Sequence, residues 1–324
     1  MSSKKIIAIL GPTASGKSAL AVKIAKKFGG EVISVDSRQV YKGMDIGTGK
    51  IKKEEMEGIA HYLLDVASPK RKFTVAQFQK LAKKAIEKIF KKGKIPILCG
   101  GTGFYLWVLT QKVSIPKVRP DWKLRRKLEK KSAKELFEIL KKLDPERAKT
   151  IEKDNKRRLI RAIEVAKKLG KVPPLKTEPL PYPILFLGIK KSKEELKKLI
   201  KRRLLKRLKE GMVEEVKKLR KSGISWKKLE EFGLEYEWVA KYLQGKIGYK
   251  EMVESLQKDI EKFAKKQMTY FKKYFPQTIW IKNHKEAEKK VKEFLKNKTP
   301  LENPTGQKNF TLQFLSLTFL FVQI

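Results

Sequence analysis

The chain has 324 residues, is 41% hydrophobic, and carries 78 Lys and Arg against 35 Asp and Glu, which gives a formal net charge of +43. This length allows one large or two ordinary domains, and the charge favours a polyanionic partner such as nucleic acid, although a general bias toward lysine would also produce it. The single Cys99 excludes a disulfide framework, and the lack of a signal peptide or an apolar run of membrane-spanning length predicts a cytoplasmic protein without membrane contact.

A phosphate-loop motif lies near the start of the chain. Residues 11–18 match the pattern G-x-x-x-x-G-K-[ST], an apolar run at 6–10 predicts a buried strand before them, and Leu20, Ile24 and Phe28 recur at helical spacing after them. In this context backbone N–H groups bind phosphate. We therefore expect a phosphate site with Lys17 on phosphate oxygens and the Ser18 hydroxyl on Mg²⁺. A glycine turn without a ligand is the alternative.

Strands and helices alternate after this motif. Short apolar runs at 31–35, 61–66 and 94–98 predict strands, and a helix is expected at 73–92. Polar or glycine-rich segments follow at 36–49 and 100–103. The pattern predicts an α/β fold with a P-loop NTPase-like parallel sheet and its site at the carboxyl ends of the strands. We expect this core to span 1–116 and 182–299, with later strands at 182–189 and 278–281 and helices at 192–221, 226–243, 249–274 and 285–296.

An all-helical insertion is expected at residues 117–181. Helices are predicted at 122–130, 133–143 and 147–169, the last either continuous or broken around Asp154, and Asp144 with Pro145 is a helix-start signal. Within it, Arg158 and Arg161 share a helix face that suits phosphate contacts, although a solvated face is the alternative. The apolar tail at 300–324 receives no role.

Two further segments contain candidate site residues. Asp36 follows the second expected strand, where an acid could bind magnesium through water or accept a proton, or simply cap the following turn. Thr102 lies in a glycine turn that could face a ligand or only connect a strand to a helix. Gln267 and Tyr270 lie among lysines on one helix, which is compatible with nucleic-acid binding or with a core stripe.

Together these segments identify a family. The chain resembles bacterial tRNA dimethylallyltransferases, the tRNA isopentenyltransferase family, from residue 6 to about residue 281. The resemblance rests on Gly11-Pro12-Thr13-Ala14-Ser15-Gly16-Lys17-Ser18, on the segment 36–48 that begins Asp36-Ser37-Arg38-Gln39, on His61-Tyr62-Leu63-Leu64-Asp65, on Gly100-Gly101-Thr102-Gly103, on Arg157-Arg158-Leu159-Ile160-Arg161, and on Lys265-Lys266-Gln267-Met268-Thr269. The chain departs from the family at Glu237, where relatives carry arginine.

The resemblance implies a reaction and roles for these residues. A dimethylallyl group would pass from dimethylallyl diphosphate to the N6 amine of adenosine 37 in tRNA, with Mg²⁺ as cofactor and a monomeric enzyme bound to the anticodon stem-loop. The loop residues Gly11, Pro12, Thr13, Ala14, Ser15, Gly16, Lys17 and Ser18 would hold the diphosphate, and Arg203 or Arg207 would close over it. Asp36 would accept the adenine proton, with Thr13 and Lys17 also in catalytic roles. Contacts to tRNA would come from Asp36, Ser37, Arg38, Gln39, Thr102, Arg125, Arg157, Arg158, Leu159, Ile160 and Arg161.

Three other activities share the phosphate loop. An ATP-dependent small-molecule kinase would not explain the segment 36–48 or the basic insertion. Prenylation of free adenine nucleotides, as by adenylate isopentenyltransferases, would not need the arginine-rich insertion. A nucleic-acid-binding NTPase would release phosphate without transferring a prenyl group.

Overall fold

The computed structural model describes residues 4–111, 113–174 and 176–297. These residues divide into two compact units, one formed by the described residues up to Thr110 and from Leu180 on, and the other by Gln111–Pro179. The second unit thus begins before residue 117, because the two connecting segments pair through their backbones, from Ser114 N to Lys176 O and from Glu178 N to Gln111 O, both at 2.9 Å. The tail at 300–324 lies outside the described residues.

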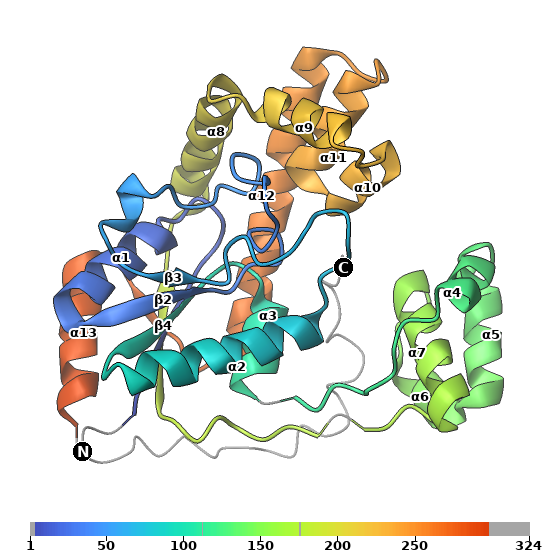
Figure 1. The fold of residues 1–324 in the computed structure, drawn as a ribbon, viewed down its shortest axis with the longest axis horizontal. Helices are drawn as coiled ribbons and strands as arrows, with labels where there is room; N and C mark the ends of the chain where they lie inside the picture. The colour runs from blue at the N-terminus through green and yellow to red at the C-terminus, as the bar shows by residue number, and fades with distance from the viewer. Residues whose placement is uncertain (1–3, 112, 175, 298–324) are drawn as a thin grey trace. The chain divides into compact units, whose positions relative to one another are not determined.

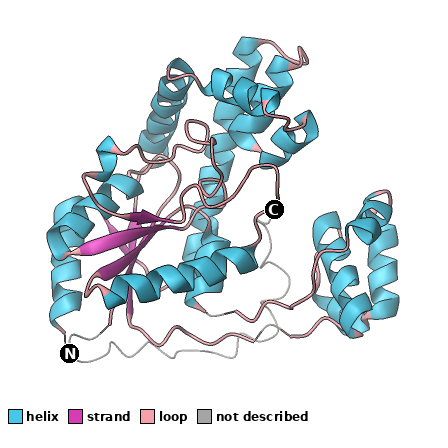
Figure 2. Cartoon of the chain, in the orientation of Figure 1, coloured by secondary structure: helices cyan, strands magenta, loops and turns pink. Residues whose placement is uncertain are grey.

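The first unit contains a sheet with helices around it (Figures 1 and 2). The sheet has six strands in the order β3-β2-β4-β1-β5-β6, and every neighbouring pair is parallel. This confirms the predicted parallel sheet. Its strands are β1 (Ile6–Leu10), β2 (Gly30–Ser34), β3 (His61–Tyr62), β4 (Ile95–Cys99), β5 (Ile184–Ile189) and β6 (Ile279–Ile281). The strand expected at 61–66 ends at Tyr62, because Leu63 and Asp65 have φ of 65° and 56°, outside the extended region.

Helices cover both faces of this sheet because its strand residues are apolar on both sides. Ile7 and Ile9 form a core cluster with residues of α1 (Lys17–Phe28) and α13 (His284–Lys296), whereas Ile6 and Ala8 point the opposite way and are equally buried. Beyond that cluster, α2 (Val75–Lys91) packs on β2 and β4 and contacts α3 (Gly103–Thr110), which contacts α12 (Tyr249–Tyr274). A short 3₁₀ helix, Glu54–Met56, lies in the connection between β2 and β3.

Four further helices precede α12 (Figure 1). They are α8 (Lys193–Lys209), α9 (Met212–Lys221), α10 (Trp226–Phe232) and α11 (Leu234–Leu243). Gly211 and Gly233, with φ of 96° and 74°, divide the runs expected at 192–221 and 226–243. These left-handed conformations suit glycine, and each reverses the chain so that consecutive helices pack on one another.

The second unit is a cluster of α4 (Trp122–Glu129), α5 (Ala133–Leu143), α6 (Pro145–Thr150) and α7 (Lys156–Leu169). Its core includes Leu136, Leu140 and Ile163, all at 0% exposure. Asp144 caps α6 by accepting from Arg147 N at 3.0 Å, and Asn155 caps α7, which produces the expected break around Asp154. In the part of the chain that the structure describes, no helix is long and apolar enough to cross a membrane.

Candidate active site

The phosphate loop connects β1 to α1 in a conformation with three left-handed or glycine-specific residues. Gly11, Ala14 and Gly16 have φ of 149°, 62° and 90°, and no side chain caps α1 at Gly16. The first N–H groups of α1 are therefore available to an anion. Ser15 Oγ is buried and has no hydrogen-bond partner among the described residues, as expected of a group that a ligand would satisfy.

The ammonium group of Lys17 lies inside this loop and donates to Pro12 O at 2.7 Å. Burial lowers the pKa of Lys17 to about 8, and the guanidinium of Arg203 also lowers it. Two cations held close together without an anion are unfavourable, so the arrangement is suited to an anionic ligand.

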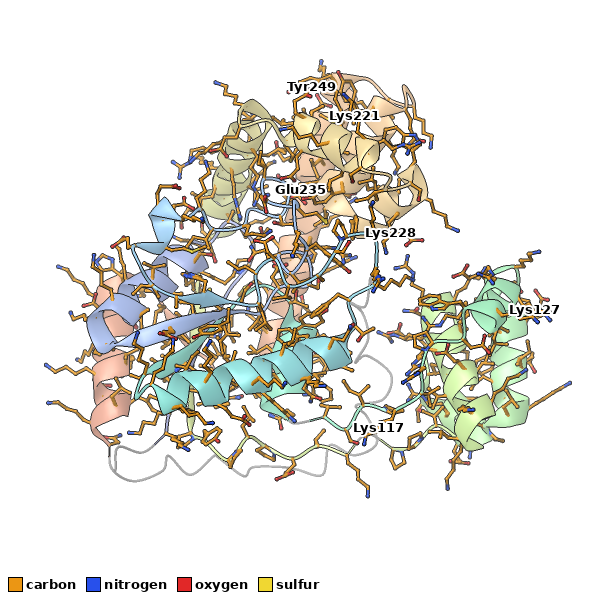
Figure 3. The ribbon with its side chains drawn as sticks, in the orientation of Figure 1. Lys117, Lys127, Lys221, Lys228, Glu235 and Tyr249 are labelled. Carbon is orange, nitrogen blue, oxygen red and sulfur yellow. The ribbon has the colours of Figure 1, made fainter. Side chains whose placement is uncertain are left out.

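Arg203 and Arg207 of α8 contact different parts of the site. Arg203 donates from Nη1 to Thr13 Oγ1 at 3.3 Å and from Nη2 to Gly49 O at 3.4 Å. Arg207 instead donates to Gly47 O at 3.2 Å and forms an ion pair of 2.9 Å with Glu235, which Figure 3 labels. Burial and the charge of Arg207 lower the pKa of Arg203 to about 10, so Arg203 remains cationic at neutral pH. Of the two, the structure thus brings Arg203 into contact with the phosphate loop.

Asp36 follows β2 and forms a turn with its own backbone. Its Oδ1 accepts from Arg38 N at 2.8 Å and from Gln39 N at 3.2 Å, which is the capping geometry considered above. Its other oxygen has no hydrogen bond in the described part of the chain, and a Cβ placed on Gly101 would lie 4.0 Å from it. One carboxylate oxygen therefore fixes the turn, while the other is available for chemistry.

The neighbours of Asp36 also hold this turn. Thr102 Oγ1 accepts from Ser37 N at 3.0 Å, Arg38 Nε donates to Phe232 O at 2.8 Å, and Gln39 Nε2 donates to Gly49 O at 3.3 Å. These residues come from several elements, namely the segment after β2, the start of α3 and the end of α10. The structure brings them together with Asp36.

Gln267 has a position that the sequence analysis did not identify. It is 3% exposed, accepts from Thr13 N at 2.8 Å through Oε1, and donates from Nε2 to Gly101 O at 2.8 Å. It therefore links the phosphate loop to the turn beside Asp36. Tyr270 and Tyr274 of the same helix are buried, so they belong to the core. A lone amide in such a stripe was the available signal, since a buried amide needs polar partners.

In the second unit the expected basic residues differ in their surroundings. Glu164 forms ion pairs with Arg125, at 2.7 Å, and with Arg161. Arg158 is 7% exposed and pairs with Glu152 at 2.8 Å, whereas Arg157 is exposed. Leu159 and Ile160 belong to the core of this unit. Arg157 is thus the member of the arginine cluster whose side chain is most open to solvent.

Residues that suit magnesium lie close to the phosphate loop. Mg²⁺ prefers oxygen ligands, keeps several waters and is held by one or two protein groups together with phosphates. The Ser18 hydroxyl in the first turn of α1 and the second oxygen of Asp36 fit that requirement. No group of three or more His, Cys, Asp or Glu side chains that could hold a metal ion occurs within residues 4–111, 113–174 and 176–297.

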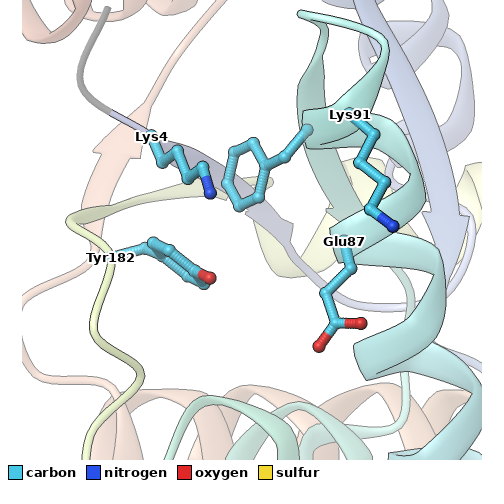
Figure 4. Close-up of a pocket in the computed structure, with 5 residues that line it drawn as sticks. Lys4, Glu87, Lys91 and Tyr182 are labelled. Atoms are coloured by element: carbon cyan, nitrogen blue, oxygen red, sulfur yellow. The ribbon is translucent and has the colours of Figure 1, made fainter. Parts of the chain in front are cut away.

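A hollow elsewhere in the first unit is separate from these residues. It has a volume of about 190 Å³ and is lined by Lys4, Glu87, Phe90, Lys91 and Tyr182 (Figure 4). Lys4 and Tyr182 precede β1 and β5, so the hollow lies at the amino ends of the strands, opposite the phosphate loop.

Comparisons with known proteins agree with this geometry. The family model IPP transferase matches residues 39–274. A tRNA dimethylallyltransferase of Acetivibrio thermocellus is 40% identical over 301 residues, covering 90% of this chain and 96% of the relative. One of Carboxydothermus hydrogenoformans is 39% identical over 302 residues, with the same coverage.

Solved structures give the same result. The tRNA isopentenylpyrophosphate transferase of Bacillus halodurans superposes with a TM-score of 0.68 at 34% identity, covering 90% of this chain and 96% of that one. A eukaryotic dimethylallyltransferase acting on tRNA shares the fold, with a TM-score of 0.78 at 24% identity, covering 97% of this chain and 85% of that one. The chain therefore belongs to the IPP transferase family, whose curated relatives are prenyltransferases named tRNA dimethylallyltransferase.

Proposed function

We propose that this chain transfers the dimethylallyl group of dimethylallyl diphosphate to the N6 amine of adenosine 37 in tRNA, which yields N6-isopentenyladenosine and diphosphate. The observation that carries the proposal is the presence, at the carboxyl edge of one sheet, of a phosphate loop with Lys17 and Arg203 after β1 and of a carboxylate, Asp36, after β2, with β4 between the two strands. One part suits the departing diphosphate and the other suits the acceptor amine.

The departing group needs positive charge and directed N–H groups. In the proposed complex the N–H groups at the start of α1 hold the diphosphate, Lys17 turns from Pro12 O to a phosphate oxygen, and Arg203 covers it from α8. Ser18 would hold Mg²⁺, which would disperse charge on the diphosphate when bound. Thr13 contributes its hydroxyl beside Arg203.

The acceptor needs a base because its lone pair is delocalised into the adenine ring. Asp36 is the proposed acceptor of the N6 proton, through the oxygen that its own turn does not use. Adenosine 37 must leave the anticodon stack to reach it, at a cost of a few kcal/mol. Ser37, Arg38, Gln39 and Thr102 would line the approach of the base. The exposed Arg157 would serve the stem-loop through a phosphate contact, while Arg125, Arg158 and Arg161, through their ion pairs, would hold the helix around Leu159 and Ile160 in place.

One experiment tests this function against its rivals. The enzyme, expected to act as a monomer, is incubated with unmodified tRNA, labelled dimethylallyl diphosphate and Mg²⁺, and the tRNA is then digested to nucleosides. We expect labelled N6-isopentenyladenosine from position 37. Label on free adenine nucleotides would support an adenylate isopentenyltransferase, and phosphate transferred or released from ATP without prenylation would support a kinase or NTPase.

A further inference from the structure

Glu215 of α9 is a buried carboxylate whose hydrogen bonds converge on one segment of the chain. It is 8% exposed and lies in the first turn of α9. Its Oε2 accepts from the N–H groups of Asp45 and Ile46, both at 2.7 Å, and its Oε1 accepts from Gly47 N at 3.0 Å and from the Tyr236 hydroxyl at 2.7 Å. Hydrogen bonds to an ionised carboxylate are roughly twice as strong as neutral ones. The carboxylate therefore fixes residues 45–47.

The same segment holds Arg203 and Arg207 of α8. Gly47 O accepts from Arg207 and Gly49 O accepts from Arg203, at 3.2 and 3.4 Å. Arg203 then contacts Thr13 in the phosphate loop. A continuous path of contacts thus leads from Glu215 through two backbone carbonyls to the residues proposed to bind diphosphate.

Close packing restricts where this segment can lie. A Cβ on Gly47 would be 2.7 Å from the ring of Tyr236, and one on Gly49 would be 1.6 Å from a guanidinium nitrogen of Arg207. A side chain at Gly47 would therefore displace the buried Tyr236 ring, and one at Gly49 would displace the guanidinium groups and would also have to adopt a φ of 59°. If the carboxylate no longer held the N–H groups, movement of residues 45–49 would displace the carbonyls that orient both arginines.

We propose that Glu215 is a positioning residue for prenyl transfer, which acts by fixing residues 45–49 so that Gly49 O aligns Arg203 at the phosphate loop while Gly47 O holds Arg207. The inference rests on the proposed function. Three backbone N–H groups and a hydroxyl require a four-fold acceptor, which a carboxylate provides and an amide does not. A displacement of about 1 Å at a reacting group can cost roughly 100-fold in rate.

The test is a double-mutant cycle between Glu215→Gln and Arg203→Met. Single-turnover transfer to unmodified tRNA is measured for both single variants and the double variant. We expect Glu215→Gln alone to slow transfer by about 10- to 100-fold, but by only a few-fold in the Arg203→Met background, since the arginine that it aligns is then absent. Hydrogen exchange of residues 45–47 should also be faster in Glu215→Gln.

Glu31→Gln is the matched control. Glu31 is likewise a buried carboxylate with several donors, but it lies at the start of β2, away from the phosphate loop. We expect it to lower Tm without changing the transfer rate at a temperature at which both proteins are folded. Glu215→Gln behaving in the same way, or additive effects in the cycle, would overturn the inference.

Two further measurements keep the inference testable. If Glu215→Gln does not fold, Tyr236→Phe removes one donor and leaves the carboxylate in place; faster exchange at 45–47 with a few-fold slower transfer supports the inference, and no change in either refutes it. If the unmodified enzyme transfers no prenyl group, the proposed function fails. The affinity of the same three variants for inorganic diphosphate is then measured. Additive effects of Glu215→Gln and Arg203→Met on this affinity would separately refute the role of Glu215.

Discussion

Raising the pH from about 7.5 to about 9 should weaken the binding of dimethylallyl diphosphate by about eightfold, because Lys17 loses its proton in this range. Burial lowers its pKa to about 8. The ligand binds the protonated form, so affinity is greatest below this pKa and is lost as the pH rises through it. The protonated fraction falls from about three quarters to about one tenth, which sets the magnitude.

Other groups contribute little in this range. A terminal phosphate with a pKa near 6 is already ionised at both ends of it. Arg203, with a pKa of about 10, keeps its charge. A lysine with an ordinary pKa near 10.5 would remain protonated, and affinity would then change by less than about 10%.

Isothermal titration calorimetry in buffers of different ionisation enthalpy measures both the affinity and the proton uptake. Near pH 9 we expect the uptake of about one proton on binding, since the bound anion restores the charge of Lys17. Lys17→Met should bind more weakly and lose most of this pH dependence. Constant affinity without proton uptake would show that Lys17 is well solvated, which would refute the assigned effect of burial.

Three other predictions follow from individual contacts. Asp36→Asn should preserve tRNA affinity and the turn, because an amide oxygen still accepts from the Arg38 and Gln39 N–H groups. It should nevertheless slow single-turnover transfer by about 100- to 10,000-fold, because an amide cannot take the proton. Activity within a few-fold of the unmodified enzyme would show that Asp36 is not a general base. Arg157→Ala should reduce the slope of log tRNA affinity against log salt by about 0.7 to 0.9, because one phosphate contact is lost. Arg158→Ala should mainly lower Tm, because it breaks the ion pair of the buried Arg158 with Glu152. Equal slopes for Arg157→Ala and the unmodified protein would show that Arg157 is only a solvated residue. Burial raises the pKa of Glu31, but hydrogen bonds from Lys94, Tyr62 and Lys92 outweigh it and lower the pKa to about 2. Glu31 therefore stabilises the fold above about pH 4.5 and loses this effect as the pH falls toward 2. In denaturant titrations, Glu31→Gln should lower the free energy of unfolding by about 1–2 kcal/mol at neutral pH and by almost nothing at pH 2. The neutral-pH value is kept small because the two lysines that pair with Glu31 are 40–47% exposed.

Local sequence signals were sufficient for the architecture. Apolar runs predicted strands that the structure contains within a few residues, and the predicted order of strand, glycine loop and helix around residues 11–18 is the order found, from β1 to α1. Asp144 and Pro145 predicted the start of α6. These features are encoded within a few residues of where they act, so a single sequence is enough to find them.

Contacts between segments that are distant in the sequence could not be predicted from such local signals. Gln267 accepts a hydrogen bond from Thr13, 254 residues away in the sequence, and Glu215 accepts one from Gly47, 168 residues away. No sequence periodicity relates residues so far apart. Helical spacing placed Arg158 and Arg161 on one face, but it could not show that Glu152 and Glu164 pair with them. The sequence thus identified the residues with reactive groups better than the residues that hold them in place.

That difference has a consequence for how variants of the site are interpreted. Ser37, Arg38 and Gln39 each use a backbone or side-chain group to hold the turn that contains Asp36, so replacing one of them changes the position of the proposed base as well as any contact to RNA. A loss of transfer in such a variant is therefore not by itself a loss of RNA binding. Two results together would assign the residue to RNA recognition. The variant must bind tRNA more weakly in the absence of dimethylallyl diphosphate. Adding Asp36→Asn to the variant must also slow transfer by the same factor as it does in the unmodified enzyme.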